Sequence, residues 1–152
     1  GSTIVGQNLG ANKVDRAEKT AYTAAFVGAL TMCFLLLFFL LFPGWIMGLF
    51  TSQQEVIEAG IPMIRIVCIG LFATSIMFGL ASVFTGSGYN IPFLVSSIIS
   101  RWLIQIPFLY IAIVMLKTPL LYVWISFPVA DLVEFFVILF YFKKEKWKSV
   151  RV

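Results

Sequence analysis

The stretch that decides the fold runs from Ala21 to Gln54 and reads AYTAAFVGALTMCFLLLFFLLFPGWIMGLFTSQQ. These 34 residues carry no formal charge, and a second uncharged stretch extends from Ile66 to Ser100. The whole chain is 12% charged and 61% hydrophobic, whereas soluble domains are about 25% charged. Lipid is therefore the solvent for much of the surface, and the sequence predicts an all-α membrane protein.

Turn residues divide the chain into four transmembrane helices, preceded by a short N-terminal helical piece. Each span needs about 20 apolar residues, and the runs are too long for barrel strands of about 10 residues. Ser52 and Glu55 have the spacing of a capping box at the start of the second span, and Pro107 and Pro128 predict kinks in the last two. The predicted spans are residues 21–42, 55–85, 91–116 and 119–142.

The basic residues favour one orientation of these spans. Eight of the eleven lie before the first span or after the fourth, and an even number of spans places both groups on one side. They are Lys13, Arg16, Lys19, Lys143, Lys144, Lys146, Lys148 and Arg151. The positive-inside rule makes this side cytoplasmic. The sequence thus predicts a multi-pass protein of the plasma or inner membrane, with both ends cytoplasmic, residues 143–152 as a basic tail, and no nucleic-acid partner.

Away from the ends of the predicted spans, four charged residues remain: Arg65, Arg101, Asp131 and Glu134. Each costs a few kcal/mol at the bilayer centre, so each is expected to face protein or a watery cavity. At about 1.5 Å per residue, Arg101 and the two carboxylates lie at a similar depth on neighbouring antiparallel helices. Arg101 is therefore predicted to pair with Asp131, Glu134 or both, whereas Arg65 lies nearer the outer side.

A polar stripe runs along the third span, where Ser97, Arg101 and Gln105 recur at intervals of four residues. Two interpretations stay open for the stripe and the carboxylates that face it. The cluster is either a structural ion pair that holds two helices together, or a site where a carboxylate binds and releases an ion or a proton during transport.

Small residues recur at spacings of four, three and four along the second span. They are Ser75, Gly79, Ser82 and Gly86. Such a face lets two helix backbones approach closely, and helices could also slide along it. Cys33 and Cys68 lie in apolar runs and are interpreted as small buried hydrophobic residues. The sequence has no histidine and no nucleophile, zinc or phosphate-loop motif, so no enzyme, metal site or cofactor is predicted.

The segment VGQNLGANK, residues 5–13, resembles the multidrug and toxic compound extrusion (MATE) transporters, which carry a Gly-Gln-x-x-Gly-Ala signature at a cytoplasmic corner between helices. Here the signature falls on Gly6, Gln7, Gly10 and Ala11. Gly6 and Gly10 are expected to permit a tight break between two helices. The Gly-x-Gly turn at residues 86–92 is a second, fairly specific similarity, and the segments 62–66, 106–107 and 146–148 are weaker ones.

The resemblance implies that residues 1–152 form a partial C-terminal bundle of a twelve-helix, two-bundle transporter, from the end of helix eight through helix twelve. Its partners would be membrane lipid, the missing N-terminal two-thirds of the transporter and a small cationic substrate. Such proteins export cationic or apolar drugs by alternating access, coupled to Na⁺ or H⁺. The candidates in this chain for ion coupling or for the cavity wall are Arg65, Ser97, Arg101, Gln105, Asp131 and Glu134.

Two other functions stay open. A lipid-linked saccharide flippase of the same superfold would need cationic groups for a diphosphate, for which Arg65 and Arg101 could serve. Asp131 and Glu134 count against this function if they neutralise Arg101. The chain could also be a non-transporting membrane scaffold or assembly subunit.

Overall fold

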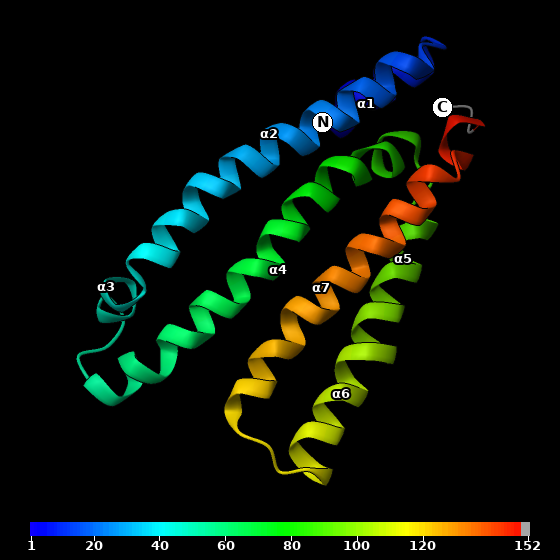
Figure 1. Ribbon diagram of the computed structural model, residues 1–152. Helices are drawn as coiled ribbons and strands as arrows, with labels where there is room; N and C mark the ends of the chain where they lie inside the picture. Colours follow the sequence, from blue (N-terminus) through cyan, green and yellow to red (C-terminus); the bar gives the residue numbers. More distant parts are fainter. Residues whose placement is uncertain (150–152) are drawn as a thin grey trace.

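The computed structural model describes residues 1–149, which form helices joined by short loops and no strands (Figure 1). Arg151 of the predicted basic tail lies outside the described residues. The elements are α1 (Ser2–Gly10), α2 (Val14–Leu41), α3 (Pro43–Gly48), α4 (Gln54–Ser87), α5 (Ile91–Ser97), the π-helical η1 (Ile98–Gln105), α6 (Ile106–Tyr110), the π-helical η2 (Ile111–Met115), α7 (Leu120–Lys143) and the 3-10 helix η3 (Lys146–Ser149).

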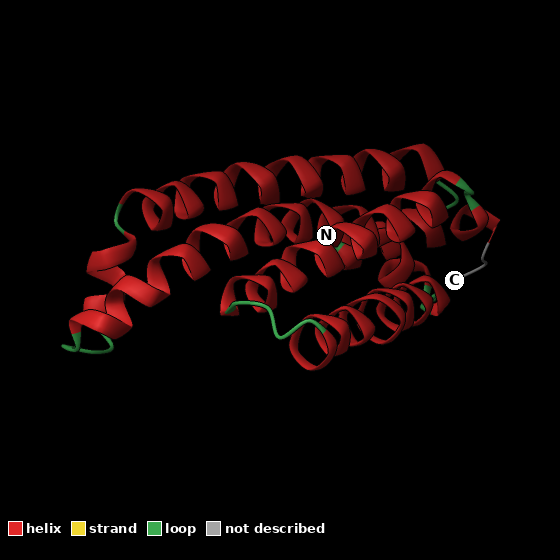
Figure 2. Ribbon diagram, turned by 60° about the horizontal axis from the view of Figure 1, so that its bottom comes forward, coloured by secondary structure: helices red, strands yellow, loops and turns green. Residues whose placement is uncertain are grey.

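Four helical segments within residues 1–149 are long and apolar enough to cross a membrane: α2, α4, the segment from α5 to η2, and α7. The prediction of an all-α membrane protein is confirmed. The helix α2 also includes the charge-rich segment 15–19, so it begins before residue 21, where the predicted span starts. Figure 2 shows that the loops lie at the ends of the long helices, as expected for antiparallel spans.

The helix α4 occupies the centre of the bundle. It packs against α2 on one side and α7 on the other, and the segment from α5 to η2 packs against α7 (Figure 1). In its most apolar window 56% of α4 is buried, against 11% of α2 and of the third span. The outer helices therefore leave most of their apolar surface uncovered, as lipid or further helices would require.

Small residues bring the backbones of α2 and α4 into contact. A Cβ added to Gly79 would overlap the backbone nitrogen and Cα of Ala25 and lie 2.7 Å from its Cβ. A Cβ added to Gly28 would lie 3.3 Å from the Ser75 carbonyl oxygen. The α2 side of this contact is a stripe that the sequence analysis did not single out, although its spacing is equally regular. It consists of Ala17, Ala21, Ala25 and Gly28.

The N-terminal corner differs from the prediction. Gly6 lies inside α1 and contacts α4, since a Cβ on Gly6 would lie 2.9 Å from the Gly86 carbonyl oxygen. The chain turns instead after Gly10, where Asn12 adopts a left-handed backbone with φ of 56°. The predicted role of Gly6 in breaking the helix is therefore wrong: its missing side chain serves the close approach of two helices.

The start of α4 also differs. Gln53 is the N-cap residue, and no side chain caps the helix. The Gln53 N–H lies 3.2 Å from the Thr51 hydroxyl, which accepts its hydrogen bond. The predicted capping box at Ser52 and Glu55 is wrong, because the helix begins after Gln53 and the Thr51 side chain forms the turn before it.

The helix η3, which follows α7, packs against α7 and α4, and its Lys148 reaches the start of α2. Trp147 is fully buried and stacks on Phe142 with ring centroids 5.7 Å apart, and its indole N–H donates to the Phe142 carbonyl at 3.2 Å. The Lys148 ammonium lies 2.7 Å from a Glu145 oxygen and 2.6 Å from a Glu18 oxygen. Hydrogen bonds to Glu145 and Glu18 raise the pKa of Lys148. Two of the basic segments of the chain are thus joined at one end of the bundle.

Candidate functional site

The third span is not a regular α-helix, and its irregular part carries the polar stripe. The Ile106 N–H donates to the Arg101 carbonyl five residues earlier, which is the π-helical pattern of η1. Pro107 follows directly in α6. In an α-helix its ring would meet the carbonyl of Leu103, four residues before it, and the wider π-helical turn moves that carbonyl away. Pro107 therefore lies directly after a π-helical segment that contains Arg101 and Gln105.

Arg101 reaches across to α7 and contacts both of its carboxylates. Its Nη2 donates to Asp131 Oδ1 at 2.7 Å and to Glu134 Oε2 at 3.3 Å. Its Nη1 donates to the Gln105 amide oxygen at 3.1 Å, which holds the guanidinium along its own helix. The ion pairs predicted from the depth of the residues are present, and Gln105 of the stripe belongs to the same network.

Two serine hydroxyls complete the surroundings of Glu134. Ser97 donates to Oε1 at 3.1 Å, and Ser100 donates to Oε2 at 3.3 Å. Ser100 was missed in the sequence, because the stripe was drawn at four-residue intervals and Ser100 follows Ser97 by three. Residues three apart also share a helix face, so the sequence does contain the spacing that predicts Ser100 as part of the stripe. We call Ser97, Ser100, Arg101, Gln105, Asp131 and Glu134 the polar network.

A glycine on α4 borders the polar network at Asp131. A Cβ on Gly70 would overlap Asp131 Oδ2 and lie 2.9 Å from the Pro128 Cα. The absence of a side chain at Gly70 therefore leaves room for the Asp131 carboxylate between α4 and α7. The sequence alone does not single out Gly70 among the glycines of the second span.

The polar network holds one positive and two negative formal charges. The Asp131 and Glu134 side chains are each only 11% exposed, whereas the Arg101 side chain is 40% exposed. Buried charges are stable only when paired and hydrogen-bonded, because removing them from water is expensive. The hydroxyls and the shared guanidinium satisfy this requirement in part, and the network as a whole keeps a net formal charge of −1.

Other candidates from the sequence lie apart from the network. Arg65 is exposed on α4 and forms no ion pair with any residue between 1 and 149. Gln7 is exposed on α1, and Ala11 is exposed in the turn that follows. Of the small residues on α4, Ser82 is buried near the chain start, and a Cβ on Gly86 would lie 2.7 Å from the Ser2 carbonyl oxygen.

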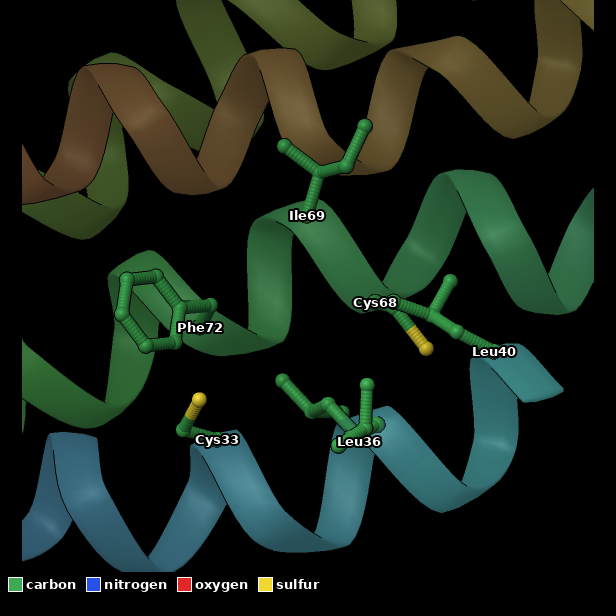
Figure 3. A pocket seen from close by; sticks show the side chains of 7 residues that line it. Cys33, Leu36, Leu40, Cys68, Ile69 and Phe72 are labelled. Carbon is green, nitrogen blue, oxygen red and sulfur yellow. The ribbon is translucent and has the colours of Figure 1, made fainter.

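An apolar groove lies between α2 and α4 and is separate from the polar network (Figure 3). Cys33 of α2 and Cys68 of α4 line it, and both are free thiols. Cys68 is buried as predicted, whereas Cys33 is exposed, so its prediction as a buried residue is wrong. The other residues that line the groove are Leu36, Leu37, Leu40, Ile69 and Phe72. Apart from the two thiols, the lining side chains are hydrocarbon.

Four apolar helices, two of them joined by a partly buried ion-pair network, define a multi-pass α-helical membrane protein. The MatE family model matches residues 1–111, which include Arg101 but end before α7. The chain therefore belongs to the MatE family of membrane transporters. Searches of curated proteins and of solved structures gave no match to it.

Proposed function

We propose that this chain is the C-terminal part of an ion-coupled antiporter, which exports cationic or apolar small molecules in exchange for Na⁺ or H⁺. In this proposal an N-terminal part of the same transporter supplies the other wall of the cavity, and access alternates between the two sides of the plasma or inner membrane. Both ends of the chain face the cytoplasm, as the basic residues at the start of α2 and the end of α7 favour.

The charge balance of the polar network carries this proposal. Two carboxylates share one guanidinium nitrogen, so the network has a formal charge of −1. An unbalanced charge at membrane depth costs a few kcal/mol, and a proton or a monovalent cation would remove the imbalance. A site that is stable only when it holds one exchangeable positive charge has the property that an antiporter needs.

The same geometry favours an antiporter over a flippase for lipid-linked saccharides. A diphosphate would require guanidinium or ammonium groups that are free to bind it. Arg101 already donates to three side chains, two of them carboxylates, and a phosphate would meet the repulsion of Asp131 and Glu134. Arg65 is the one remaining span arginine, and it stands alone on an exposed face of α4.

A drug-resistance and efflux assay on the full-length parent tests the proposal. Asp131→Asn and Glu134→Gln are expected to abolish resistance and active efflux of a cationic dye while the protein stays in the membrane. Glu55→Gln is the matched control, because Glu55 is an exposed carboxylate outside the network. Unchanged efflux with unchanged ion dependence in both network variants would overturn the coupling role. Binding of a diphosphate lipid without dye efflux would favour the flippase.

A further inference from the structure

We propose that Glu134 is the group that takes up and releases a proton during transport, and that Asp131 stays ionised as the fixed partner of Arg101. This division of roles rests on the proposed function and adds to it the identity of the ion and of the residue that carries it.

The contacts of Asp131 favour the ionised form of its carboxyl group. Its bond from Arg101 is 2.7 Å long, the length of a strong charge-assisted hydrogen bond. Its second oxygen lies against the backbone of α4 at Gly70, where there is no side chain. No hydroxyl within the described residues contacts Asp131. Protonation would therefore weaken its strongest interaction, and no contact in the network would compensate for that loss.

Glu134 has partners that suit both protonation states. Its bond from Arg101 is longer, at 3.3 Å, and each of its oxygens accepts a hydrogen bond from a serine. A hydroxyl has one donor and two acceptor positions and can rotate. Ser97 and Ser100 can therefore donate to the carboxylate and accept from the carboxylic acid without any change in packing.

The charged groups around Glu134 come from two elements. On α7 the neighbouring charge is Asp131, and on η1 it is Arg101. The helix α4 carries no charged residue from Ile66 to Ser87, and α5 carries none along its length. Arg101 can balance only one of the two carboxylates, and its contact with Asp131 is the shorter one, so the excess negative charge is assigned to Glu134. A bound proton makes the network neutral, which lowers the cost of keeping it in an apolar layer.

A proton fits this position better than a sodium ion. A hard cation needs several oxygen ligands around it, and the Arg101 guanidinium already binds Asp131 Oδ1 and Glu134 Oε2. A cation beside Glu134 would also be repelled by the Arg101 guanidinium, which lies 3.3 Å from the carboxylate. In the uptake step an O–H bond forms on Glu134 and hydronium on one side of the membrane becomes water. In the release step that bond breaks and water on the other side accepts the proton.

The experiment uses the full-length parent in proteoliposomes with ethidium as the cationic probe. The wild type should transport ethidium when driven by a pH gradient, and a sodium gradient should have no effect. Glu134→Gln should lose pH-driven transport, down to the level of empty vesicles, and keep ethidium–ethidium exchange, which no longer depends on pH. Asp131→Asn should lose both activities, because Arg101 is left without its close partner. Glu55→Gln is the matched control.

Infrared difference spectra across a pH titration provide a readout that does not depend on transport. We expect one protonated-carboxyl band that disappears in Glu134→Gln and remains in Glu134→Asp. Retention of pH-driven transport by Glu134→Gln, or loss of the band in Asp131→Asn alone, would overturn the assignment. If transport is driven by a sodium gradient and Glu134→Gln abolishes it, the assignment of the proton as the coupling ion is contradicted, and the proposal of an antiporter stands. Failure of the wild type to transport ethidium with either gradient would overturn both proposals.

Discussion

Replacement of Gly79 by alanine is expected to force α2 and α4 apart. The new Cβ would overlap backbone atoms of Ala25 and lie 2.7 Å from its Cβ, and no rotation of a side chain can relieve a clash with the backbone. Separation by about 1 Å is needed to reach ordinary van der Waals contact, and overpacking of this kind costs about 3 kcal/mol. The better helix propensity of alanine returns about 1 kcal/mol, so the free energy of unfolding should fall by about 2 kcal/mol.

The measurement is equilibrium unfolding of the purified parent in mixed micelles, followed by tryptophan fluorescence. Gly48→Ala is the matched control, because a Cβ added to Gly48 at the end of α3 meets nothing within 4 Å. The control should be as stable as the wild type or slightly more stable. If Gly79→Ala were within about 0.5 kcal/mol of the wild type, as surface substitutions usually are, the close contact between α2 and α4 would be refuted.

Two further predictions concern Gly70 and Lys148. Gly70→Ala should displace the Asp131 carboxylate by about 1 Å and weaken its bond to Arg101, which lowers the free energy of unfolding by about 2–3 kcal/mol. A variant as stable as the wild type in the same micelle assay would contradict the contact. Since the folded-state pKa of Lys148 is raised above 10.5, its ion pairs should stabilise the protein fully below pH 10.5 and cease to do so as the pH rises through the folded-state value. The stability difference between wild type and Lys148→Met, about 0.5–1 kcal/mol, should therefore disappear only at alkaline pH, and its loss near neutral pH would argue against these pairs.

The spans could be predicted from the sequence because an uncharged run longer than thirty residues admits few alternatives. The contact of Arg101 with Asp131 and Glu134 could also be predicted, since depth on an antiparallel helix follows from the count of residues to the membrane edge. Both predictions depend only on the number of residues between two positions, which can be counted in the sequence.

The remaining features depend on how one helix meets another. Gly6 and Gly70 each lie where a second backbone approaches, and nothing in their local sequence distinguishes them from a glycine that ends a helix or fills a span. The π-helical segment η1 depends on how the chain accommodates Pro107, for which a kink is an equally valid solution. Ser100 is a different case. Its three-residue spacing from Ser97 places both on one helix face, and a search that includes three-residue intervals predicts it as part of the polar stripe.

The most direct test of the account is reversal of the charges in the polar network. Arg101→Glu brings three carboxylates together and should lower the membrane abundance of the full-length parent. It should also lower the free energy of unfolding by about 3 kcal/mol, because the two largely buried carboxylates lose their cation. A second substitution, Asp131→Arg or Glu134→Arg, restores an opposite charge across the two helices and should recover part of both quantities. If neither double variant is more stable than Arg101→Glu alone, Arg101 does not pair with α7 and the account is contradicted.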